Sequence, residues 1–208
     1  FRGTPKIPIV HYLKRTEEVD WVYYPKAGDR RALSELFIVD ILSRRQVRVD
    51  TGEEPAHYPL GWRPDGSELL FLRVARYAKK LELLAADAAT GSTRVILTET
   101  SETFVSFPFR SPASMFSLLA DERRFIWLSE RDGWHHLYLY NLDGTLLRRL
   151  TQGPFPVVSV VSVAEESGWV YFLAQGDPRR PSDTHLYRVS LEGKGLQQLT
   201  EATGQHTI

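Results

Sequence analysis

The sequence predicts an all-β protein that repeats one small antiparallel sheet along the chain. Aromatic residues make up 12% of the 208 residues, and rings and branched side chains pack well on pleated surfaces. The apolar runs are about five residues long and end at turn residues, which is typical of strands rather than helices.

Strands are expected at five of these runs, namely 35–39, 68–72, 124–128, 136–140 and 169–173. Three turns that follow or precede such runs contain glycine: 64–66, 142–144 and 191–193. A tight hairpin turn often requires the positive φ that glycine adopts easily. Each of these turns is therefore expected to join two antiparallel strands.

Residues 77–89 are helix-like in composition. We nevertheless expect a strand at 81–87, because the repeat requires a strand at that place.

The repeat is the most informative feature of the sequence. Similar strand-and-turn units start at Leu36, Leu81, Leu137 and Leu186, which are 45, 56 and 49 residues apart. An aromatic-containing strand is expected upstream of each start, at 21–24, 70–72, 125–127 and 169–172. A period of about 50 residues with three or four short strands is typical of one β-propeller blade.

The predicted fold class is therefore an all-β β-propeller fragment of about four blades, with approximate blades at 20–52, 58–100, 114–153 and 156–201. Blades stack on one another because a single small sheet cannot bury both of its faces. A β-sandwich or meander barrel is the alternative all-β fold, and the even spacing of the repeats argues against it.

Composition excludes several functional classes. The chain has 26 basic and 26 acidic residues and a formal net charge of zero, so it has no overall attraction for nucleic acid. No window approaches 18 consecutive apolar residues, so no membrane span is expected. The chain has no cysteine, which removes disulfides, thiolate metal ligands and a cysteine nucleophile.

Catalytic signatures are absent from the sequence. There is no Gly-x-Ser-x-Gly nucleophile motif, no phosphate-binding glycine loop and no His-Glu-x-x-His motif. His135 and His136 are neighbours on an expected strand, where successive side chains point to opposite faces, so they are not expected to bind one metal ion. We predict no catalytic residue, no metal site and no cofactor in this chain.

One loop carries a candidate binding group. Arg110 lies in a proline-rich and aromatic stretch, residues 107–112, where its planar guanidinium could hold a carboxylate or a carbonyl group. The alternative is structural, with Arg110 packing over the ring of Phe109.

The run 125–140, which contains Ser-Glu-Arg-Asp-Gly-Trp-His-His at 129–136, resembles the N-terminal β-propeller of the dipeptidyl peptidase IV family, serine peptidases of the prolyl oligopeptidase clan. Three further segments agree with the family in order: 24–28, 61–66 and the pair 171–173 and 185–189. The resemblance covers essentially the whole chain and suggests a bacterial member.

The resemblance implies a peptidase with two parts, an eight-bladed propeller and a C-terminal α/β-hydrolase domain that carries the catalytic Ser, Asp and His. This chain would be the second half of that propeller, a non-catalytic portion that shapes the chamber for a peptide substrate. The family's acidic pair that binds the substrate's amino terminus would precede Phe1, and neither Glu17-Glu18 nor Glu53-Glu54 matches its place.

Two further roles follow from the resemblance. Phe109 and Arg110 match a Phe-Arg pair on a propeller loop near the amino-terminal side of the substrate. Residues 8–24, within the N-terminal segment 1–24, match an arm that contributes to dimerisation, so a homo-oligomer is expected. A periplasmic or extracellular location is also implied by the family.

Two other functions compete with this interpretation. A non-enzymatic propeller that acts as a binding or scaffold module would have the same fold and no hydrolase domain. A propeller glycosidase would need paired carboxylates facing inward, whereas the acidic residues here are mostly in turns. The glycosidase is the least favoured of the three.

Overall fold

The computed structural model describes residues 4–29, 34–54, 56–107 and 111–206. In these ranges the chain forms strands and two short 3-10 helices, η1 (Arg76–Ala78) and η2 (Pro112–Met115). All strand pairs in the five sheets are antiparallel. The all-β prediction is confirmed.

Three sheets have four strands in sequence order. The first contains β5 (Ala56–Trp62), β6 (Glu68–Val74), β7 (Lys80–Asp87) and β8 (Thr93–Thr100). The second contains β9 (Phe116–Leu118), β10 (Arg124–Ser129), β11 (His136–Asn141) and β12 (Leu146–Arg149). The third contains β13 (Val157–Ala164), β14 (Trp169–Ala174), β15 (His185–Ser190) and β16 (Gln197–Gln198). The strand expected at 81–87 is present as β7.

Two further sheets have two strands each. They are β1 (Lys6–His11) with β2 (Glu18–Tyr23), and β3 (Phe37–Val39) with β4 (Gln46–Arg48). The structure corrects one expectation here, because residues 21–24 were expected to belong to the same unit as 36–39. Instead Trp21 lies opposite Pro8 in the β1–β2 hairpin. A strand separated by only six residues is the nearest available partner, and pairing with it closes the smallest loop.

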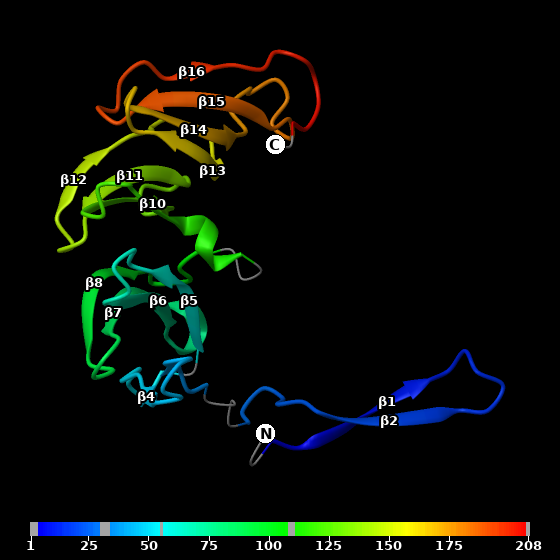
Figure 1. The fold of residues 1–208 in the computed structure, drawn as a ribbon. Coiled ribbons are helices and arrows are strands. Elements are labelled where there is room, and N and C mark those ends of the chain that lie inside the picture. Colours follow the sequence, from blue (N-terminus) through cyan, green and yellow to red (C-terminus); the bar gives the residue numbers. More distant parts are fainter. Residues whose placement is uncertain (1–3, 30–33, 55, 108–110, 207–208) are drawn as a thin grey trace.

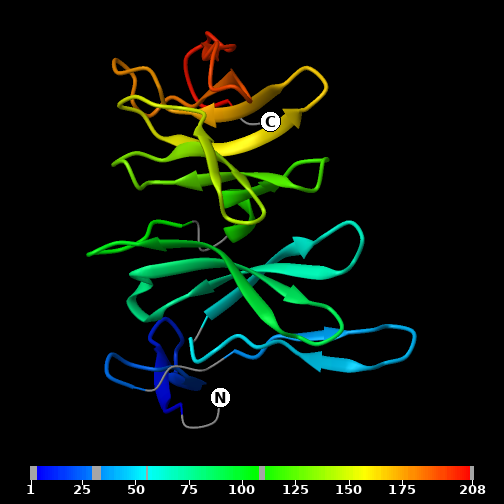
Figure 2. The ribbon, with the colours of Figure 1, turned by 90° about the vertical axis from the view of Figure 1, so that its left-hand side faces the viewer.

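The sheets lie one above another along an arc (Figures 1 and 2). In Figure 1 the first strands β5 and β13 lie toward the concave side, whereas β8 and β12 lie on the convex side. The β1–β2 hairpin projects away from the stack at its N-terminal end (Figure 1).

The core lies between the sheets and explains the apolar runs in the sequence. On β6, Leu69 and Phe71 pack toward the β3–β4 sheet, and Leu70 and Leu72 pack toward the next sheet. Successive strand residues point to opposite faces, so a sheet that is covered on both faces requires an uninterrupted apolar run. β14 instead alternates, and its half-buried positions include Tyr171, because only one face of this last sheet is covered.

Glycine turns fit closely against the preceding sheet. Gly144, in the β11–β12 turn, has a φ of +91°, and a Cβ built on it would overlap the carbonyl oxygen of Ile96 on β8. Gly91, in the β7–β8 turn, makes the same approach to Arg48 on β4. The turn glycines therefore serve the packing between sheets as well as the backbone conformation of the turns.

The described residues contain no helix that is long and apolar enough to cross a membrane.

Candidate functional site

The two predicted site residues, Phe109 and Arg110, lie outside the described residues. The residues that flank them are well anchored. The ring of Phe107 is buried and meets Tyr58 of β5 edge to face, with the ring centroids 5.8 Å apart. After the loop, Met115 at the end of η2 is also buried. Phe107 is therefore fixed against β5, which lies toward the concave side of the stack (Figure 1).

The most distinctive sequence run, 129–136, carries a polar network. Arg131 donates hydrogen bonds to the buried Ser129 Oγ at 3.0 Å and to the hydroxyl of Tyr140, and it forms an ion pair with Glu99. Its guanidinium also lies over the ring of Tyr138, 4.6 Å from the centroid. Burial opposes the charge of Arg131, but Glu99 and Tyr140 hold its pKa above the usual value.

The next residue of the run is equally engaged. Asp132 accepts a 2.6 Å hydrogen bond from the hydroxyl of Tyr138 and forms an ion pair with Arg149 at 3.0 Å. Burial of the Tyr138 ring, together with this hydrogen bond, raises the pKa of its hydroxyl. Asp132 thus ties the β10–β11 connection to β11 and to Arg149 at the end of β12.

His136, the second histidine of the pair, has a structural role. The imidazole of His136 is fully buried; its Nδ1 contacts Thr151 Oγ1 and its Nε2 contacts the carbonyl oxygen of Gly153, both at 3.0 Å. Thr151 Oγ1 also accepts the backbone N–H of Leu137. Within the described ranges, no group of three or more His, Cys, Asp or Glu side chains could hold a metal ion.

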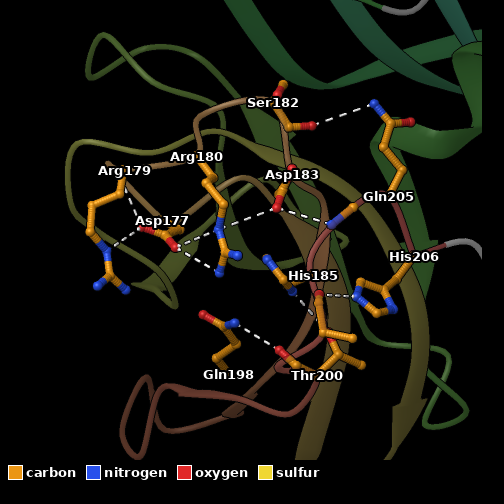
Figure 3. Close-up of polar contacts among 12 residues, drawn as sticks. Asp177, Arg179, Arg180, Ser182, Asp183, His185, Gln198, Thr200, Gln205 and His206 are labelled. Carbon is orange, nitrogen blue, oxygen red and sulfur yellow. Dashed lines mark hydrogen bonds and ion pairs between the residues drawn. The ribbon is translucent and has the colours of Figure 1, made fainter.

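The same arrangement returns in the third four-stranded sheet (Figure 3). His185 Nδ1 lies 3.2 Å from Thr200 Oγ1, which accepts the backbone N–H of Leu186. Here, however, the Nε2 of His185 is buried and has no hydrogen-bond partner in the part of the chain that the structure describes. Ala202 follows His185 in the chain at the same spacing at which Gly153 follows His136. The carbonyl oxygen of Ala202 is contacted not by His185 but by His206 Nε2.

The loop between β14 and β15 is held by local ion pairs (Figure 3). Asp177 binds both Arg179 and Arg180 at 3.3 Å, and Asp183 binds Arg180 at 3.4 Å and the backbone N–H of Gly204 at 3.0 Å. The backbone N–H of Arg179 is the main cause of the lowered pKa of Asp177. The side chain of Arg179 is 86% exposed, so this end of the loop faces solvent.

Sequence reasoning missed Glu99. It lies at the end of β8 in no recognisable motif, yet it accepts hydrogen bonds from Trp127 Nε1, at 2.9 Å, and from Arg131. The sequence signal for Glu99 is an acidic residue near the end of an apolar strand. Many exposed residues share this pattern, so it does not single out Glu99.

Comparison with known proteins identifies related chains. A family model described as the dipeptidyl peptidase IV (DPP IV) N-terminal region matches residues 2–208. The chain is 24% identical to a protein of Emericella nidulans named "Probable dipeptidyl peptidase 4", over 97% of this chain and 28% of that protein. It is 20% identical to dipeptidyl peptidase 4 of Trichophyton rubrum, over 95% of this chain and 26% of that protein.

A solved structure shares the fold. Porphyromonas gingivalis dipeptidyl peptidase 4 superimposes with a TM-score of 0.81 at 21% identity, over 98% of this chain and 28% of that chain. This likeness confirms the predicted fold class, a fragment of a β-propeller. The chain spans little more than a quarter of the length of the proteins it matches.

Proposed function

Because the chain belongs to the family of dipeptidyl peptidase IV N-terminal regions, we propose that it is the non-catalytic propeller portion of a dipeptidyl-peptidase-like serine exopeptidase. The observation that carries this proposal is the match of residues 2–208 to that family. The partners of the propeller would be a C-terminal α/β-hydrolase domain and a peptide substrate. A periplasmic or extracellular location belongs to the same proposal.

The three four-stranded sheets would be the blades with approximate boundaries 58–100, 114–153 and 156–201, and the first of them begins slightly earlier, with β5 at Ala56. β3 and β4 would be the outer two strands of the blade assigned to 20–52. Two features support this assignment. First, β4 comes directly before the first strand of the next sheet, β5, as β8 comes directly before β9. Second, the Val49 N–H donates a 2.9 Å hydrogen bond to the Leu36 carbonyl, and the Leu150 N–H donates an equivalent 2.7 Å bond to the Leu137 carbonyl.

The concave side of the stack would form one wall of the substrate chamber. Phe107 contacts Tyr58 of β5, and η2, which follows the 108–110 segment in the chain, also contacts β5. In this proposal Arg110 binds a carbonyl or carboxylate group of the peptide through its planar guanidinium, and Phe109 contacts the amino-terminal part of the peptide. Neither residue takes part in bond cleavage.

The β1–β2 hairpin, within residues 8–24, would contribute to a homodimer. An isolated two-stranded hairpin is marginally stable in water, and this one exposes large apolar side chains. Trp21 on β2 is 61% exposed, and Tyr12 and Leu13 at its tip are more exposed still. A partner subunit that covers these residues would stabilise the hairpin.

Catalysis is tested by expressing the longest reading frame that contains this chain, alongside the 208-residue chain alone, and assaying an X-Pro chromogenic dipeptide substrate. The proposal predicts turnover by the long protein and none by the chain alone. Arg110→Ala in the long protein should raise KM at least tenfold. Turnover by the isolated chain would overturn the proposal, and an inactive long protein without a nucleophile motif would favour the scaffold module.

The dimer is tested separately by light scattering on the same long protein. Trp21→Arg should lower the dimer fraction because it places a charge in the apolar contact. Leu146→Arg, on the exposed edge strand β12, is the matched control and should leave the dimer unchanged. Equal dimer fractions in all three proteins would exclude the hairpin as the contact.

A further inference from the structure

A cavity of about 540 Å³ lies at the junction of the first two four-stranded sheets. One wall is formed by the end of β8 and the segment that follows it, between Thr98 and Ser106, and the other by Glu130, Arg131 and Gly133 of the β10–β11 connection. The proposed function assigns this cavity no role.

The wall of this cavity carries an uncompensated negative charge. Arg131 is already neutralised, because Glu99 pairs with it and its other donors are bound to Ser129 and Tyr140. The carboxylate of Glu130 is different. Its side chain is 46% exposed, and its one ion pair among the described residues is a distant contact, 4.0 Å, with His135 Nε2. A cation that enters the cavity therefore finds a carboxylate with free acceptor capacity.

The cavity also has an apolar surface. Phe104 is 45% exposed and belongs to the lining of the cavity. The same residue lines a neighbouring cavity of about 230 Å³ together with Tyr58 and Tyr77. An aliphatic chain could lie along these rings, and a positive group near the Phe104 face would gain a cation–π contact.

Hydroxyl groups complete the lining. Ser101, Thr103 and Ser106, in the segment after β8, belong to the lining of the cavity, and hydroxyl oxygens accept hydrogen bonds from N–H donors. A guanidinium group has five such donors and an ammonium group has three. The lining therefore offers acceptors, one free carboxylate and an aromatic face, and the one arginine in the wall is occupied.

We propose that this cavity is a binding site for an organic cation on an aliphatic stem, the chemical class of the arginine and lysine side chains. The positive head group binds Glu130 and the neighbouring hydroxyls, and the stem packs on Phe104. Arg131 is a structural part of the wall, since its partners hold it in place whether or not a ligand is bound.

The test uses agmatine, an alkylguanidinium, and its neutral urea isostere N-carbamoylputrescine as probes for the 208-residue chain, with binding measured by calorimetry and by NMR shift mapping. Agmatine should bind at least tenfold more tightly than the isostere, and the shifts should centre on Phe104 and Glu130. Equal affinity for the two probes, or shifts confined to other regions, would overturn the proposal.

Variants locate the charge. Glu130→Gln keeps the shape of the side chain and should weaken agmatine binding at least fivefold. Glu166→Gln, in the exposed β13–β14 turn, is the matched control and should bind agmatine as the wild type does. Phe104→Ala provides a second variant and should weaken binding two- to fivefold. If Glu130→Gln and Glu166→Gln weakened agmatine binding equally, the cause would be the general charge of the protein, and the proposed site would be overturned. Unchanged agmatine binding in Glu130→Gln would also overturn it.

Discussion

The indole N–H of Trp127 on β10 donates a 2.9 Å hydrogen bond to the carboxylate of Glu99 on β8. Trp127 is fully buried, and Glu99 belongs to the preceding sheet. The bond therefore fastens two sheets that share no backbone ladder. Because Arg131 binds the same carboxylate, one acidic side chain connects the edge of one sheet to two positions of the next.

Glu99→Ala is expected to destabilise the fold by about 2–3 kcal/mol, because it leaves the indole N–H and a half-buried arginine without their acceptor. Glu192→Ala is the control, since Glu192 is an exposed residue that pairs with Arg148. Its loss should cost less than about 1 kcal/mol. Urea unfolding measures both, and equal costs would show that the Glu99 contacts contribute no more than a surface ion pair.

Gly144→Ala should destabilise the protein more than Gly133→Ala. The two glycines have nearly equal φ angles, +91° and +89°, so alanine suffers similar backbone strain at both. Only at Gly144 does a Cβ meet a backbone atom, the carbonyl oxygen of Ile96, whereas nothing lies within 4 Å of the Cβ position at Gly133.

The expected loss is about 1–2 kcal/mol for Gly133→Ala and at least about 1 kcal/mol more for Gly144→Ala, because the two sheets must move apart. Thermal unfolding of the two variants measures the difference. Equal shifts in Tm would mean that the β11–β12 turn can move to accommodate the Cβ without disturbing the packing between the two sheets.

The Trp127–Glu99 and Gly144–Ile96 contacts show which parts of the fold can be predicted from the sequence and which cannot. Strand positions and the glycine turns could be predicted because short apolar runs and turn chemistry are local. The strand at 81–87 was also predictable, since the repeat outweighed its helix-like composition. The pairing of β2 with β1 was not, because several strands could compete for one partner. Glu99 and Trp127 are 28 residues apart on different sheets, and no motif links them.

The candidate site shows the same division. Phe109 and Arg110 were selected by family resemblance and by the chemistry of arginine, and they remain a prediction. The run 129–136 also carries the resemblance, yet in the structure Arg131, Asp132 and His136 are bound to their own neighbours. A distinctive run can therefore reflect the needs of packing as well as those of binding.

His136→Leu should cost more stability than His185→Leu. The first variant loses contacts from both ring nitrogens and leaves the carbonyl of Gly153 without its donor, a loss of about 2 kcal/mol. The second loses one contact and also removes a buried nitrogen that has no partner among the described residues. Its cost should be about 1 kcal/mol or less. Urea unfolding compares the two, and a larger loss in His185→Leu would contradict the assignment.

His206→Ala extends this comparison. The substitution frees the carbonyl oxygen of Ala202, which His206 now contacts at 2.8 Å. His185 can then donate to this carbonyl as His136 does to Gly153. We expect the NMR signal of the His185 Nε2 proton to gain protection from exchange with water. An unchanged exchange rate would show that the Ala202 carbonyl does not reach His185.

Stability should fall as the pH drops below about 6.5. Burial holds the pKa of His136 below its usual value, and the charge of Arg149 acts in the same direction. The unfolded chain therefore binds a proton at His136 at a higher pH than the folded chain does, so stability is complete above the unfolded pKa of about 6.5 and declines between that value and the lowered pKa. Unfolding free energies measured from pH 8 to pH 5 should show a smaller decline in His136→Leu than in the wild type. Parallel curves for the two proteins would assign the acid sensitivity to other groups.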